Sequence, residues 1–270
     1  MARVVLVGLC VFVGAVVASI GFDDCSKAFI NGYVPHYPSG AAKICREGEI
    51  AIAYDVDMVN PAYSAYYVTP ADMKNHISGR DSFYEDPDLK TLGITQAKVD
   101  SDAFNTSWNR GHCCPNNIMS FNEIAKKATF TMANVAPQAA YFNQHPWQYL
   151  ENDVISWITN NYALHMVTGV AYKHRDSARR SYDNIAVPDY YFKVVCDVTN
   201  GESVGFVGDN NGDGEGTAEM RTVQDVEAIY GGYLLPFSTC NPHRVNTSHW
   251  WSSEKLANMP HLRINVNRRV

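Results

Sequence analysis

Residues 108–153 contain three polar pieces set between apolar runs: WNRGHCCP at 108–115, ATFTMANVAPQ at 128–138 and FNQHPWQYLEND at 142–153. Apolar residues recur at helical spacing from Pro146 to Asn160, which predicts a helix over this range. Asn143, Trp147 and Glu151 recur every four residues and therefore fall toward one side of that helix. At about 1.5 Å rise per residue, Asn143 and Glu151 are expected about 12 Å apart along its axis.

The residue types in these pieces suit phosphodiester hydrolysis. Arg110 supplies a permanent cation for phosphate oxygens, and His112 accepts a proton near neutral pH. Asn143 offers an oxygen to a hard cation, while Glu151 is too far away for direct coordination and can hold that ion's waters. A base, a cation and a hydrated Mg²⁺ are sufficient for this chemistry.

Each of these residues also has a purely structural explanation. Asn143 lies three residues before Pro146 and can cap the helix. His112 can be a satisfied core histidine, and Glu151 an exposed helical residue. The residue types alone leave both interpretations open.

The rest of the chain predicts an α+β fold with a largely antiparallel sheet, because strands dominate early and late around a central helix. A second helix is expected at Thr222–Tyr230, with Thr222 as its cap. No repeat or linker divides residues 22–270, which are expected to form a single domain. The predicted strands are Glu49–Asp55, Tyr63–Thr69, Ala128–Asn134, His165–Tyr172, Tyr190–Asp197 and Val204–Val207.

Residues 1–21 have the pattern of a secretory signal peptide: Arg3, an apolar stretch and then small residues. The chain after the signal is expected to be secreted, with no membrane association.

The formal charge of −6 excludes a histone-like basic coat but not an enzyme that contacts nucleic acid locally. Basic clusters occur at Lys126–Lys127, Lys173–Arg175, Arg179–Arg180 and Arg263–Arg269.

Six cysteines follow the signal, and an even number in an exported chain predicts disulfides. The preferred pairs are Cys25 with Cys45 and Cys196 with Cys240, while Cys113 and Cys114 are left unassigned. Sequons at Asn105 and Asn246 predict glycosylation. The segment Asp209–Gly216 partly matches a calcium loop, but Met220 stands where the final carboxylate belongs, which favours an acidic hairpin loop.

The three polar pieces resemble the DNA/RNA non-specific endonucleases, the ββα-metal or His-Me finger nucleases that include endonuclease G. The family's Asp-Arg-Gly-His signature has its counterpart in residues 109–112, and its Asn-x-x-Pro-Gln element in residues 134–138. Its third element matches Asn143, Gln144, Trp147, Leu150 and Glu151. The resemblance implies the ββα-metal fold, with a central antiparallel sheet flanked by helices, and cleavage of DNA and RNA that leaves 5′-phosphate ends.

The resemblance also implies roles for individual residues. His112 would be the general base and Asn143 the direct ligand of Mg²⁺, for which Mn²⁺ can substitute. Arg110 would contact the reacting phosphate, with Asn134 and Glu151 supporting the metal and its waters. Arg80 stands where a second phosphate-binding arginine is expected, although an ordinary surface arginine fits this position as well. A homodimer is one option for the assembly.

Two departures from the family pattern leave alternatives open. Asn109 replaces the signature aspartate, so an altered rate or a catalytically impaired nucleic-acid-binding homologue is the alternative function. Cys113 and Cys114 stand where the family has small or apolar residues; they allow a disulfide behind His112 or a Cys113/His112 nucleophilic pair. A calcium-dependent structural module around Asp209–Gly216 is a third hypothesis.

Overall fold

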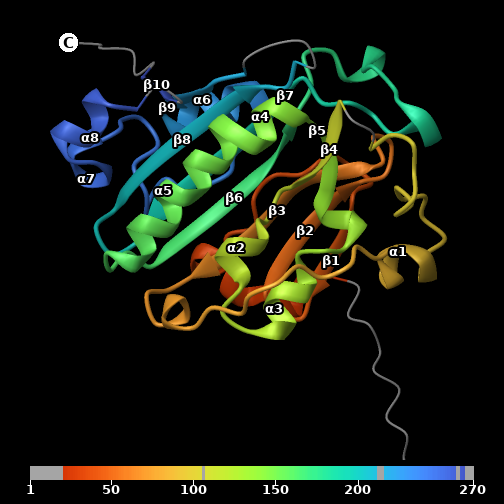
Figure 1. Cartoon of the computed structure of the whole chain (residues 1–270), viewed down its shortest axis with the longest axis horizontal. Coiled ribbons are helices and arrows are strands. Elements are labelled where there is room, and N and C mark those ends of the chain that lie inside the picture. The colour runs from red at the N-terminus through yellow and green to blue at the C-terminus, as the bar shows by residue number, and fades with distance from the viewer. Residues whose placement is uncertain (1–20, 105–106, 212–215, 260–261, 265–270) are drawn as a thin grey trace, which may run out of the picture.

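The computed structural model describes residues 21–104, 107–211, 216–259 and 262–264 (Figure 1). Within them, eight strands form one sheet in the order β1-β2-β3-β6-β7-β8-β9-β10, antiparallel throughout except for the β9–β10 pair. These strands are β1 (Ala42–Arg46), β2 (Ile50–Asp55), β3 (Asn60–Val68), β6 (Leu164–Ala171), β7 (Tyr190–Asp197), β8 (Glu202–Asp209), β9 (Ala218–Arg221) and β10 (Leu262–Ile264). The expected α+β fold with a mainly antiparallel sheet is confirmed.

Short helices and a second, two-stranded sheet surround this sheet. The second sheet pairs β4 (Trp108–His112) with β5 (Val135–Ala139). The α-helices are α1 (Pro87–Thr91), α2 (Asn116–Met119), α3 (Glu123–Ala128), α4 (Ala140–Phe142), α5 (Gln148–Thr159), α6 (Val223–Tyr230), α7 (Thr247–Trp250) and α8 (Ser253–Ala257). Between α4 and α5 lies the π-helical turn η5 (Asn143–Trp147), and short 3₁₀ turns include η1 (Asp23–Ala28) and η4 (Met132–Asn134).

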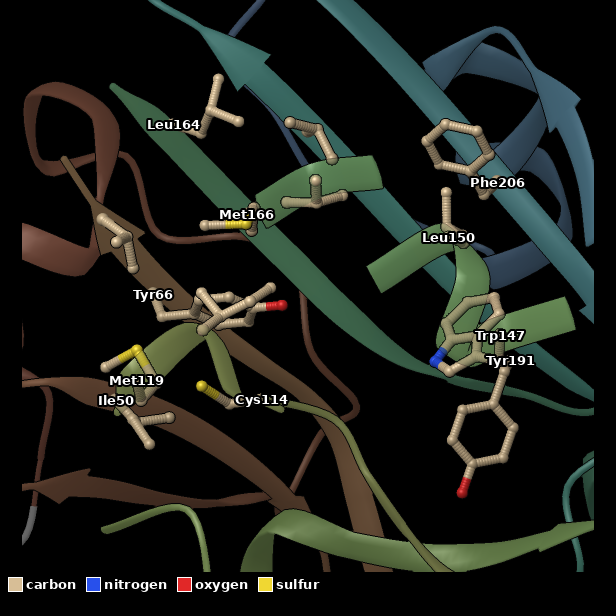
Figure 2. Close-up of a cluster of buried hydrophobic side chains, with 14 of the residues drawn as sticks. Ile50, Tyr66, Cys114, Met119, Trp147, Leu150, Leu164, Met166, Tyr191 and Phe206 are labelled. Carbon is tan, nitrogen blue, oxygen red and sulfur yellow. The ribbon is translucent and has the colours of Figure 1, made fainter. Parts of the chain in front are cut away.

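The large sheet buries side chains on both faces because successive residues of a strand point to opposite sides. In β2, Ile50 and Ile52 belong to the core shared with α2, α3 and α5, whereas Ala51 belongs to the core shared with η1 and α6. Figure 1 shows α5 lying along the sheet, with α2 and α3 in front of the first three strands. In Figure 2, Trp147 lies beside Tyr191, and their ring centroids are 5.9 Å apart.

Local signals account for the best-predicted elements. Thr222 caps α6 by accepting a hydrogen bond from the Asp225 amide, and Gly231 ends that helix in the left-handed conformation. The bounds of β7 match the predicted strand, and the predicted helix at Pro146–Asn160 corresponds to the end of η5 together with α5.

The strand predicted at Ala128–Asn134 is wrong. Asn122 caps α3 by accepting from the Ala125 amide, so this helix continues to Ala128. A loop and η4 follow, and the strand begins only at Val135, where pairing with β4 starts. The apolar residues of this segment are buried in a loop, and periodicity alone does not distinguish a buried loop from a buried strand.

Both preferred disulfides are present: Cys25–Cys45 joins η1 to β1, and Cys196–Cys240 joins β7 to the segment after α6. Residues 1–20 of the signal-peptide pattern, the Asn105 sequon and half of the candidate calcium loop (residues 212–215) lie outside the described residues. None of the helices in the described ranges is long and apolar enough to cross a membrane.

Candidate active site

The two-stranded sheet positions His112 at the end of β4. Gly111 lies so close to the large sheet that an added Cβ would be 2.5 Å from the Tyr191 hydroxyl and from the Gln138 side chain. The Tyr191 hydroxyl in turn donates a hydrogen bond to the Ala136 carbonyl in β5. Glycine therefore allows β4 to lie here, and the alternation of the strand turns His112 to the opposite side.

His112 is held by two aromatic rings. Its ring centroid lies 5.2 Å from that of Phe83 and 5.4 Å from that of Phe130. The buried Nε2 has no hydrogen-bond partner among the described residues. Burial, and to a smaller extent the charge of Arg80, lower the pKa of His112 to about 4. The imidazole is therefore neutral near pH 7, as a general base requires, and it is not a satisfied core histidine.

Asn143 lies within a continuous run of helix formed by α4, η5 and α5. Its backbone angles, φ −61° and ψ −45°, are helical, and the N-cap positions of α4, η5 and α5 fall on Ala139, Phe142 and Trp147. The capping interpretation of Asn143 is therefore wrong. Pro146 lies inside the π-helical turn, a type of turn that is frequent at functional sites.

One pocket of about 370 Å³ brings together His112, Asn143, Glu151 and Arg80. Four of the six predicted site residues thus meet in space although they come from a loop, a strand and a helix. The remaining lining residues are Gly79, Pro115, Asn116, Asn117, Phe130, Gln144 and Gln148.

Glu151 interacts electrostatically with a buried lysine that the sequence-based predictions did not include. Lys193 in β7 is fully buried and donates hydrogen bonds to the hydroxyls of Tyr66 (2.9 Å) and Thr168 (2.7 Å). Burial raises the pKa of Glu151 to about 7, an effect that the charge of Lys193 opposes. The signal in the sequence was a lysine at an inward position of an otherwise apolar strand.

Asn134, which the resemblance places in support of the metal, is fully buried and is not among the residues that line the pocket. Its Oδ1 accepts from Ser64 Oγ and the Cys114 amide, and its Nδ2 donates to the carbonyls of Cys114 and Thr129. All its hydrogen-bonding capacity is used inside the protein. Asn134 therefore acts as a positioning residue that fixes the loop directly after His112.

Arg110 lies on the same side of β4 as His112 but does not line the pocket. Its guanidinium donates to the Val99 carbonyl and lies 5.4 Å from the centroid of Phe83 and 5.2 Å from that of Phe104. Arg80 also lies 5.4 Å from the Phe83 centroid, at the pocket, where it is exposed. Phe83 thus supports two arginines and the ring of His112.

The two departures from the family pattern lie away from the pocket lining. Asn109 alternates with Arg110 along β4 and therefore points away from the side of the strand that bears His112. Cys113 and Cys114 are both buried and free, so the suggested disulfide between them is absent. Burial raises the pKa of the Cys113 thiol to about 12, which argues against a nucleophilic Cys113.

The pocket suits a hard metal ion that keeps most of its water. Its oxygen donors include the amide of Asn143 and the carboxyl of Glu151, and the imidazole of His112 stays available. Nowhere in the described ranges do three or more histidine, cysteine, aspartate or glutamate side chains gather in a way that could hold a metal. One amide ligand with a water-mediated carboxylate fits Mg²⁺ better than a fully protein-ligated ion.

Comparison with known proteins identifies the family of the chain. The model of the DNA/RNA non-specific endonuclease family matches residues 31–242, which include every residue of the pocket. The chain belongs to this family.

Over the aligned segments, three curated relatives are between 22% and 28% identical to this chain. Mitochondrial nuclease 1 of Schizosaccharomyces pombe is 28% identical over 155 residues, covering 53% of this chain and 48% of the relative. Nuclease C1 of Cunninghamella echinulata is 28% identical over 122 residues, 42% and 47% of the two chains. Human mitochondrial endonuclease G is 22% identical over 165 residues, 58% and 55%. The chain spans about half the length of the curated relatives it matches.

A solved structure, the EndoG/EndoGI complex, aligns with a TM-score of 0.58 over 78% of this chain and 88% of that one, at 19% identity. This likeness shows the fold. The expected ββα-metal nuclease fold is therefore confirmed, with β4 and β5 as its two strands and the α4–η5–α5 segment as its helix.

Proposed function

We propose that this protein is a secreted, Mg²⁺-dependent endonuclease that hydrolyses DNA and RNA without selecting the sugar. The observation that carries the proposal is the single pocket in which His112, with a free ring nitrogen, meets Asn143, Glu151 and Arg80. Family membership supports the reaction class, and the aromatic support of His112 gives it a fixed orientation.

In this mechanism the neutral His112 takes a proton from the attacking water, and Arg80 offsets the charge that develops on the phosphate. The Glu151 carboxylate accepts hydrogen bonds from water in the pocket and orients it. Asn143 would hold Mg²⁺, which when bound stabilises the charge on the leaving oxygen. By resemblance to the family, the products carry 5′-phosphate and 3′-hydroxyl ends.

Export is part of the proposal. The disulfides Cys25–Cys45 and Cys196–Cys240 are typical of an oxidising compartment. The pattern of residues 1–21 is that of a secretory signal, whereas two of the relatives above carry mitochondrial names. Glycosylation at the sequons and a homodimer remain predictions. The mass of the exported polypeptide tests the glycosylation, and the molar mass of the protein in solution tests the dimer.

The test is to incubate the purified protein with plasmid DNA and with RNA, in Mg²⁺ or in a chelator. We expect both substrates to be degraded only with the metal, and His112→Ala to lose degradation while keeping its thermal transition. His243→Ala is the matched control, because this exposed histidine contacts Gln224 and Phe237 and does not line the pocket. Full activity of His112→Ala would overturn the assignment. Binding without degradation in Mg²⁺ would indicate the catalytically impaired homologue.

A further inference from the structure

A line of arginines and aromatic rings leads away from the pocket along β4. Trp108, Arg110 and His112 occupy alternate positions of the strand and therefore share one of its sides. At about 3.3 Å per residue, Trp108 lies about 13 Å from His112 along the strand. This length equals about four nucleotides of a stacked strand, at about 3.4 Å rise per nucleotide.

Each position on this line pairs a cation with an aromatic ring. Arg179 lies over Trp108, with its guanidinium carbon 4.8 Å from the ring centroid. Arg110 lies between Phe104 and Phe83 in the same type of contact, and Arg80 lies over Phe83 at the pocket. Stacking fixes the plane of a guanidinium while its N–H groups stay available at the edge for phosphate oxygens.

These arginines lack the acidic partner that four other arginines of the described residues have. Arg46, Arg175, Arg221 and Arg244 each form an ion pair with a carboxylate. Across the described ranges no such pair involves Arg80, Arg110, Arg179 or Arg180. In a chain with a formal charge of −6, unpaired arginines that gather along one strand indicate an anionic partner.

The far end of the line opens into a second hollow of about 420 Å³. Trp108, Arg179, Arg180 and Tyr182 are among its lining residues. Arg180 is anchored by hydrogen bonds to the carbonyls of Asp57 and Asn184, and Tyr182 is 64% exposed. Exposed aromatic rings beside cations suit a nucleic-acid strand, whose bases stack while its phosphates pair with arginine.

We propose that the hollow around Trp108, Arg179 and Tyr182 is an accessory subsite that holds the nucleic-acid strand several nucleotides away from the cleaved bond. The proposal rests on the nuclease function proposed above. In this subsite, arginine contacts to phosphate supply affinity for long substrates. They allow a protein with a net negative charge to bind a polyanion.

The test compares Arg179→Gln with wild type on a tetranucleotide and a dodecanucleotide of the same sequence. We expect KM for the dodecanucleotide to rise about five- to tenfold with kcat unchanged, and the logarithmic salt slope of binding to fall by about one. A tetranucleotide cleaved at its centre does not reach Arg179, so its kinetics should not change. Arg244→Gln, an equal charge change at a paired arginine on another surface, should behave as wild type on both substrates.

Equal effects on both lengths, or no effect on either, would overturn the subsite. Fluorescence anisotropy with the labelled dodecanucleotide, in chelator and with His112→Ala, separates this outcome from failure of the proposed function. If the protein with His112 intact cleaves nothing in Mg²⁺ but its binding of the dodecanucleotide depends on Arg179, the subsite is supported and the nuclease function is rejected. If the protein cleaves the dodecanucleotide and Arg179→Gln changes neither its cleavage nor its binding, the subsite alone is rejected.

Discussion

His112 and Glu151 line the same pocket from β4 and α5, and burial moves their pKa values in opposite directions, to about 4 and about 7. His112 is therefore mainly neutral above about pH 4, but Glu151 becomes mainly ionised only as the pH rises through about 7. In the proposed mechanism, activity needs both a neutral imidazole and an ionised carboxylate. We expect the acid limb of kcat/KM to lie near the pKa of Glu151 and not at the ordinary histidine value.

Glu151→Gln tests this assignment. The variant should lose about 10²-fold or more in rate, and its remaining activity should show no limb near pH 7. Glu254→Gln, at an exposed position of α8, is the control and should keep the wild-type profile. If kcat/KM of Glu151→Gln still falls on the acid side near pH 7, the titration belongs to another group.

Lys193→Met should move the acid limb to higher pH by about one unit, because the buried ammonium that favours the ionised Glu151 is lost. The free energy of unfolding should fall by up to about 3–5 kcal/mol above pH 7, since loss of the ammonium leaves the buried Glu151 carboxylate without its compensating charge. Tyr66 and Thr168 keep the hydrogen bond between their hydroxyls at 3.1 Å. The pH–rate profile and urea unfolding measure the two effects, and an unmoved limb would show that Lys193 does not act on Glu151.

Gly111→Ala should lower both stability and activity. The new Cβ would meet the Tyr191 hydroxyl and Gln138 at 2.5 Å, so β4 must shift. Overpacking of this kind costs about 1–3 kcal/mol, and the shift displaces the attached His112. Urea unfolding and plasmid cleavage measure the effects. A variant with the wild-type midpoint and rate would show that the strand tolerates the side chain.

The sequence predicts those parts of the fold that rest on local signals. The Thr222 cap, the apolar alternation of β7 and the helical spacing of α5 all act within a few residues of each other. The segment at Ala128–Asn134 was misassigned because burial by distant elements gives a loop the same apolar content as a strand.

In the candidate site too, the sequence identifies some residues but not the contacts that others make in the fold. His112, Asn143 and Glu151 were found from motif spacing, and the structure brings them into one pocket. The satisfied amide of Asn134 and the stacking of Arg110 on Phe104 depend on partners that no local pattern reveals.

Removal of the metal should abolish cleavage, and addition of Mg²⁺ or Mn²⁺ should restore it. Asn143→Ala should weaken metal binding by about 10²-fold or more, because it removes the amide oxygen expected to bind the ion directly. The readout independent of activity is the melting temperature, which a bound ligand raises. Mg²⁺ should stabilise the wild type and Asn152→Ala, an exposed neighbour on α5, but not Asn143→Ala. Equal stabilisation of all three would place the ion elsewhere.

Cys113→Ala should retain kcat/KM within about threefold if the buried thiol takes no part in the chemistry. Its pKa near 12 keeps it protonated at neutral pH, and the side chain is fully buried next to the loop that Asn134 holds. Iodoacetamide should therefore leave the folded enzyme active. A folded Cys113→Ala protein with a loss of about 10²-fold or more would revive the Cys113/His112 nucleophilic pair, because only covalent catalysis makes the sulfur indispensable.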